Sequence, residues 1–198
     1  YHVRIEAKML RSFANKYKEI SKTFIPELET LMTSDVCNMS YMFFRCGYLT
    51  TLDLTNFNTS KVTNKSGMFV WCASLTTLDL RKFDTSKVTN MSAMFCGCEN
   101  LTTLDLSKFD TSKVTDMTLM FAGCPNLKTL DLSNFNIHAN CQVNIREDQI
   151  GLGEYVGMFE GCENLRTIKV TKCNQITIDK LKEALRKSGI QNQVKLIR

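Results

Sequence analysis

The sequence predicts an α/β repeat solenoid, a right-handed stack of coils with one parallel sheet and a different cap at each end. The main observation is a fixed period. Met-Phe pairs begin 26 residues apart, and the last begins 38 residues on, one period plus an insertion of 12. These pairs begin at Met42, Met68, Met94, Met120 and Met158. Cysteines and leucine segments keep the same step: Cys46, Cys72, Cys98, Cys124 and Cys162, and Leu49, Leu75, Leu101, Leu127 and Leu165. A period of this length indicates stacked units that bury their apolar sides against their neighbours.

The leucine segment of each unit predicts a short strand. In "LTTLDL" from Leu49, strand alternation turns Leu52 and Leu54 inward and Thr51 and Asp53 outward. The pattern L-x-x-L-x-L is typical of the strand in a leucine-rich repeat.

The rest of each unit completes the coil. Asp84 and Asp110, each followed by Thr-Ser, predict turns in which the carboxylate bonds the backbone two residues on. The segment "SAMFCGC" predicts a short helical or 3₁₀ turn with Met94, Phe95 and Cys98 inward. Lys65 occupies the place of Met91, so we expect its charged head to reach water.

The ends predict caps, because a bare terminal coil would expose its core. Residues 1–32 predict an N-terminal helical cap from an apolar stripe at helical spacing, although this helix could instead bind a partner. Residues 33–178 form the predicted solenoid, with the insertion inside 136–157 as a longer loop or a partner contact. Residues 179–198 predict a C-terminal cap: Asp179 as N-cap, a helix stopping at Gly189, and a closing strand at Val194–Arg198.

The combined pattern "MFxxCxxLTTLDLSxFDTSKVTNMSxMF" resembles the BspA-like class of leucine-rich repeats of bacterial surface proteins, over roughly residues 33–178. The resemblance implies a leucine-rich-repeat-like fold and a surface-exposed or secreted protein that binds host or matrix molecules. It implies a function only loosely, since this fold presents a surface rather than a reaction.

Stacked coils place equivalent outward residues in columns about 4.8 Å apart. An acidic column runs through the middle, and we predict that these columns form a partner-binding face. The candidate residues are Thr51, Asp53, Thr77, Asp79, Arg81, Thr103, Asp105, Thr129, Asp131, Thr167 and Lys169. The alternatives are a hydrated acidic column balanced by Arg81 and Lys169, or a cation site.

The cysteines of the main column predict buried free thiols. At the coil spacing their Cβ atoms would lie beyond the usual 3.5–4.5 Å of a disulfide, and five members cannot pair completely. The state of Cys37, Cys96, Cys141 and Cys173 is left open by the sequence.

Other functional classes find little support. The formal charge of +5 comes without a basic stripe, which disfavours nucleic acid as a partner, and no apolar stretch could cross a membrane. The chain repeats the same residue types along a line, whereas an active site needs different types at one point. We therefore expect no enzyme, cofactor or metal.

The sequence favours a monomeric protein-interaction module, an adhesin-like protein at the cell surface or secreted, that binds a protein or glycan through its strand-bearing face. The alternatives are a structural spacer within a larger surface protein and an intracellular interaction protein.

Overall fold

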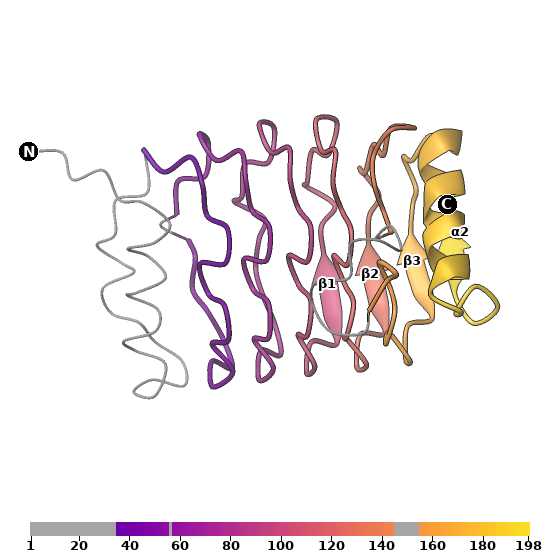
Figure 1. Cartoon of the computed structure of the whole chain (residues 1–198), viewed down its shortest axis with the longest axis horizontal. Helices are drawn as coiled ribbons and strands as arrows, with labels where there is room; N and C mark the ends of the chain where they lie inside the picture. Colours follow the sequence, from indigo (N-terminus) through magenta and orange to yellow (C-terminus); the bar gives the residue numbers. More distant parts are fainter. Residues whose placement is uncertain (1–34, 56, 145–154) are drawn as a thin grey trace, which may run out of the picture.

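The computed structural model describes residues 35–55, 57–144 and 155–198. In this part of the chain the repeats lie side by side as a row of coils, with the C-terminal helix at the end of the row (Figure 1). We number the coils by the residues between one corner and the next: 38–54, 64–80, 90–106 and 116–132, followed by a last coil at 157–170. The predicted helix within residues 1–32 lies outside the described residues.

The sheet is parallel and is formed by one short strand per unit. Its strands are β1 (Thr103–Asp105), β2 (Thr129–Asp131), β3 (Thr167–Lys169) and β4 (Lys195–Ile197), in that order. The central residues Leu104, Leu130 and Ile168 are buried and in register, while the residues beside them face outward. Each strand is only three residues long because the chain turns again as soon as it has placed its inward leucine.

The first two coils have the same arrangement without an assigned strand. Leu52, Leu54 and Leu80 are buried, and the Thr76 N–H donates to the Thr50 carbonyl one coil earlier at 3.1 Å. A parallel sheet and a helix in this order fit a leucine-rich-repeat-like fold. The right-handed sense of the coils stays a prediction.

The opposite side of each coil is a run of turns, which corrects the predicted helical turn at "SAMFCGC". In the third coil, Met94, Cys96 and Cys98 donate to carbonyls three residues back, whereas Ala93, Phe95 and Gly97 donate to the next coil. Positive φ angles at Ala93 (53°) and Gly97 (73°) turn alternate N–H groups outward, so a helix cannot form. The alternation gives each coil a second line of hydrogen bonds to its neighbour.

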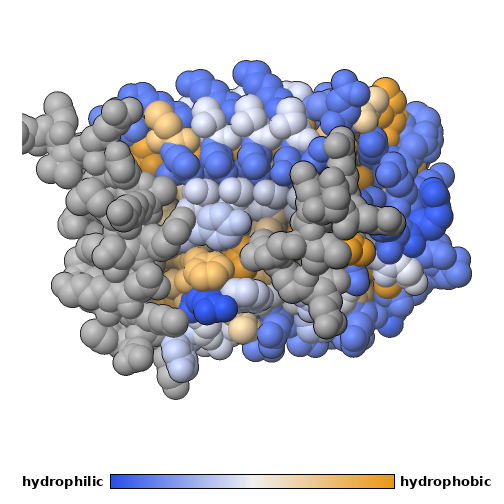
Figure 2. Space-filling model, viewed as in Figure 1, coloured by the Kyte–Doolittle hydropathy of each residue, from blue (hydrophilic) through white to orange (hydrophobic). Residues whose placement is uncertain are grey.

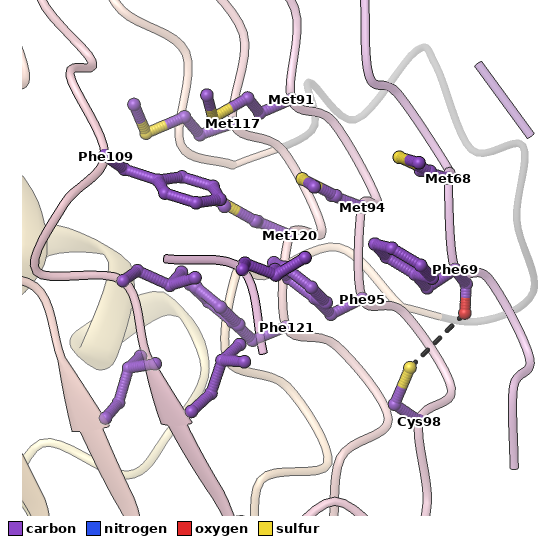
Figure 3. Close-up of a cluster of buried hydrophobic side chains, with 14 of the residues drawn as sticks. Met68, Phe69, Met91, Met94, Phe95, Cys98, Phe109, Met117, Met120 and Phe121 are labelled. Carbon is purple, nitrogen blue, oxygen red and sulfur yellow. Dashed lines mark hydrogen bonds between the residues drawn. The ribbon is translucent and has the colours of Figure 1, made fainter. Parts of the chain in front are cut away.

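The core lies between these two lines of bonds. Phenylalanine rings stack from coil to coil, with centroids 5.5 to 5.8 Å apart and planes within 9° of parallel. The rings belong to Phe43, Phe69, Phe95, Phe121 and Phe159. Figure 3 shows part of this stack beside the rows of methionines. The predicted inward positions Met94, Phe95 and Cys98 are confirmed, since none of them has any exposed surface.

The thiols of the main column are buried, as predicted. Cys98 Sγ lies 3.3 Å from the Phe69 carbonyl of the preceding coil and donates to it (Figure 3). Cys72, Cys124 and Cys162 repeat this bond at 3.1 to 3.2 Å. All nine cysteines are free in this structure, including the four whose state the sequence left open.

Lys65 contradicts the expectation that its charged head reaches water. Its side chain has no exposed surface, and its Nζ makes no hydrogen bond with the part of the chain described here. The methionines at the same position in the neighbouring coils, Met39 and Met91, are fully buried. A lysine that replaces one of them therefore lies in the same buried column.

The C-terminal helix α2 spans Gln175–Lys187 and begins earlier than predicted. Asn174, not Asp179, is its N-cap, because the Asn174 side chain accepts the Thr177 N–H at 2.8 Å. Leu181 and Leu185 are buried, and Gly189 follows the helix with φ 73°, as the sequence predicted. Strand β4 then joins the sheet where a closing strand was expected.

The insertion is anchored at its base. Gln142 continues the line of parallel bridges from Asp116, and Asn144 pairs with Gly157 in an antiparallel bridge. Residues 145–154 lie outside the described part of the chain.

Candidate interaction surface

The strand-bearing face consists of the outward residues predicted above, and the structure brings them together in columns. Thr103, Thr129 and Thr167 are paired across β1, β2 and β3, as are Asp105, Asp131 and Lys169. Thr51, Asp53, Thr77, Asp79 and Arg81 occupy the same positions in the first two coils and are exposed. Asp131 and Thr167 are half-buried. The outward residues of neighbouring coils thus have the predicted register.

Each aspartate of this face also builds a turn. Its Oδ1 accepts the backbone N–H two residues on, at 2.9 to 3.0 Å, in all four coils. These bonds run from Thr55 to Asp53, Arg81 to Asp79, Ser107 to Asp105 and Ser133 to Asp131. The bond ends the strand and starts the next corner. The turn predicted at Asp84 and Asp110 is confirmed. The same turn in the acidic column was not predicted, because there the aspartate is followed by leucine and not by the Thr-Ser pair of the corner.

The acidic column is stabilised locally in spite of its like charges. Hydrogen bonds from Thr55 hold the pKa of Asp53 below its ordinary value, and the opposing influence of Asp79 is the smallest of those acting on it. Hydrogen bonds from the Ser107 side chain and backbone lower the pKa of Asp105 in the same way. These carboxylates therefore stay ionised at neutral pH.

Two cations accompany the column: Arg81 stands two residues after Asp79, and Lys169 follows Asp131 at the end of the column. Arg81 donates from its Nη2 to Asp79 Oδ2 at 2.6 Å and from its Nε to Oδ1 at 3.0 Å. These bonds lower the pKa of Asp79 to about 2. Lys169 Nζ lies 3.9 Å from Asp131 Oδ2. Because the Arg81 side chain is 71% exposed, its pair with Asp79 adds little stability but orients the carboxylate.

The face is also slightly hollowed. A depression of about 230 Å³ lies between the first two coils, lined by Leu54, Thr55, Asp79, Arg81 and Lys82. Its lining combines the apolar Leu54 with one carboxylate and two cations.

The hydroxyl residues of the corner have a different role. Thr85 Oγ1 donates to the Asp110 carbonyl at 3.0 Å and accepts the Asp110 N–H at 2.8 Å, and Thr59 does the same with Asp84. Thr89 and Thr115 donate to carbonyls one coil back. Polar side chains thus run in parallel rows along the coils, as Figure 2 shows. Repetition of these hydroxyls serves the stacking of coils, whereas the aspartates of the strand-bearing face accept N–H groups from within their own coil.

None of the described helices is long and apolar enough to cross a bilayer.

The comparisons with known proteins place this chain in a family. Residues 7–78 and 68–145 match the family described as "Mycoplasma protein of unknown function, DUF285", and the chain belongs to it. None of the curated proteins matches the chain. Among solved structures, the leucine rich repeat protein of T. pallidum (TpLRR) is similar, with 17% identity and a TM-score of 0.40. That similarity covers 78% of this chain and 77% of the other. The chain is thus a repeat protein of the DUF285 family.

Proposed function

We propose that this protein is a non-catalytic, adhesin-like interaction module that binds a protein or glycan ligand through its strand-bearing face. The proposal includes a location at the cell surface or outside the cell, in keeping with the resemblance to BspA-like repeats, and action as a monomer. Its support is the set of outward residues held in register on a rigid row of coils.

The observation that carries the proposal is a comparison among the turns themselves. Asparagine makes the same turn elsewhere: Asn64 Oδ1 accepts the Ser66 N–H at 2.9 Å, and Asn90 accepts that of Ser92 at 2.8 Å. At the FDTS corner, Asn58 and Asp84 both do so. The turn therefore needs an oxygen acceptor and not a charge. Yet all four coils keep a carboxylate on the strand-bearing face, at Asp53, Asp79, Asp105 and Asp131.

A carboxylate column without a structural need for its charge suits a ligand rich in donors. Its carboxylates and the neighbouring threonine hydroxyls repeat at the coil spacing. They can accept hydrogen bonds from lysine or arginine side chains of a protein, or from the hydroxyls of a glycan.

The test is a double variant, Asp79→Asn with Asp105→Asn, which keeps both turn acceptors and removes two charges from the face. The matched control is Asp84→Asn with Asp110→Asn, which removes two charges from the same kind of turn at the corner. The probes are an immobilised glycan array and detergent-solubilised host surface proteins, with bound protein measured by fluorescence.

We expect the face variant to lose at least about tenfold in affinity for whichever probe binds the native protein, and the control variant to bind normally. Equal binding by all three proteins would refute the proposal. Absence of binding to every probe would favour a spacer role instead.

A further inference from the structure

One position in the core carries a charge-bearing side chain where its neighbours carry methionine. Lys65 follows Met39 and precedes Met91 and Met117 in the same column, one period apart. All four side chains are fully buried. Lys65 Nζ is one of two buried side-chain nitrogen or oxygen atoms without a hydrogen-bond partner among the described residues.

The groups around this amine do not neutralise it. Its Nζ lies 5.4 Å from the centroid of the Phe83 ring. Asp84 is the one charged group of the described residues whose field acts appreciably on it, and Asp84 Oδ1 is already engaged by the Ser86 N–H and hydroxyl at 2.9 and 2.7 Å. Burial lowers the pKa of Lys65 to about 7, although Asp84 acts to raise it. Charging the amine in the closed core therefore carries a free-energy cost.

Both stabilising groups lie on the same side of Lys65. Phe83 and Asp84 belong to the corner that leads from the second coil to the third, away from the first coil. A protonated amine attracts the face of an aromatic ring and a carboxylate. Protonation thus strengthens the attachment of Lys65 to the third-coil side, whereas the first coil has the apolar Met39 at the equivalent position.

The contact between the first and second coils lies on the other side of Lys65. Its backbone bonds include Met39 N–H to the Asn64 carbonyl at 2.9 Å, and the contact between the second and third coils has the equivalent bond, Lys65 N–H to the Asn90 carbonyl at 3.0 Å. The two contacts therefore differ in the groups near the amine and not in their backbone bonds. In a repeat array each unit contacts only its neighbours, so one contact can open while the other coils stay stacked.

We propose that protonation of Lys65 opens the contact between the first coil (38–54) and the second coil (64–80), so that the protein carries a pH-controlled opening at the N-terminal end of its described coils. In the open state the ammonium reaches water, and the apolar surface between Met39 and the second coil is uncovered. The third and later coils stay closed because their column holds only apolar residues, Met91, Met117 and Val143.

Two thiols report the opening directly. Cys46 of the first coil and Cys72 of the second are each 1% exposed, and Cys72 Sγ donates to the Phe43 carbonyl across the contact at 3.2 Å. Cys98 and Cys124 occupy the same position in the third and fourth coils and have no exposed surface. Together they provide two reporters and two internal references in one chain.

The experiment is pulsed labelling of the native protein with 4,4′-dithiodipyridine, which reacts with accessible thiols in acid as well as in neutral buffer. Labelling at each cysteine is measured by peptide mass spectrometry and divided by that at Cys124, so the pH dependence of the reagent cancels. Lys65→Met is the matched variant, because it places in the second coil the residue that the first and third coils carry. Asp84→Asn is a second variant, which removes the nearby negative charge and keeps the turn acceptor.

We expect the Cys46 and Cys72 ratios to rise by up to about tenfold per pH unit as the pH falls from about 8.5 to about 7, and to level off below it, because the open state binds one more proton. Lys65→Met should abolish this rise, and Asp84→Asn should move its midpoint to lower pH. The proposal is overturned if the rise persists in Lys65→Met, if no rise occurs in the native protein, or if Cys98 becomes reactive together with Cys72.

Discussion

Replacing Thr85 by valine tests whether the repeated hydroxyls hold the coils together. Valine has nearly the shape of threonine, so the packing of this buried position (2% exposed) is retained. What is lost is the pair of bonds between Thr85 Oγ1 and the backbone of Asp110, at 2.8 and 3.0 Å. The Asp110 N–H and carbonyl then lose their partner in the next coil.

The magnitude follows from these two bonds. A hydrogen bond contributes about 1 kcal/mol net, and a buried group left without a partner costs about 1–3 kcal/mol. Since the Asp110 side chain is exposed and water can reach part of its backbone, we expect Thr85→Val to cost about 2–3 kcal/mol. Thr85→Ser keeps both bonds and removes one methyl group, which should cost about 1 kcal/mol.

The measurement is the free energy of unfolding from urea titration followed by circular dichroism. Thr103→Val on the outward side of β1 is a control, because Thr103 is exposed and makes no such link, and it should change stability by less than about 0.5 kcal/mol. The reasoning fails if Thr85→Val is as stable as Thr85→Ser, since the methyl group and not the hydroxyl would then account for the repeat of threonine.

Two further substitutions use contrasts within the chain. Gly97→Ala should destabilise by several kcal/mol more than Gly189→Ala, because both glycines have φ 73° but only at Gly97 would the new methyl group collide with the Trp71 ring; equal losses in urea titrations would show that the ring moves aside. Lys65→Met should raise the free energy of unfolding at pH 7 by a few kcal/mol, the size that a pKa lowered from 10.5 to about 7 implies. Because the unfolded chain binds the proton up to about pH 10.5 and the native core releases it near 7, native stability should rise with pH between these values and be lowest below them. Urea titrations of the native protein at several pH values should show this slope and those of Lys65→Met should not; parallel curves would mean that the amine reaches water in the folded protein.

The period of 26 residues was enough to predict which side chains lie inward and which share a column. Stacking makes the position within a repeat equivalent to a position in space, so Met94, Phe95, Cys98 and the outward Asp105 could be assigned without a structure. The parallel sheet followed from the same reasoning.

The backbone of the opposite side could not be predicted in this way. Tyr41, Ala93 and Leu119 have φ angles of 53° to 56°, close to the 59° of Gly67 at the same position in its coil. Non-glycine residues rarely adopt such angles, and the pattern of apolar residues around them also suits a helix. Bonds to the neighbouring coil compensate for the strain, and these long-range bonds leave no local signal in the sequence.

Equivalent positions in successive coils carry different residues in the same surroundings. Comparing them distinguishes residues that the fold requires from residues that it does not. At the turn positions both asparagine and aspartate occur and make the same bond, as Asn58 and Asp84 show, so charge is free to vary there. On the strand-bearing face it does not vary through four coils, although the bond is the same. In the methionine column Lys65 is the reverse case. It differs from the residues of the neighbouring coils, and its burial lowers the pKa of its amine to about 7. A charge kept where the fold does not need it, and a charge accepted where the fold opposes it, are the two features that coil stacking alone does not explain.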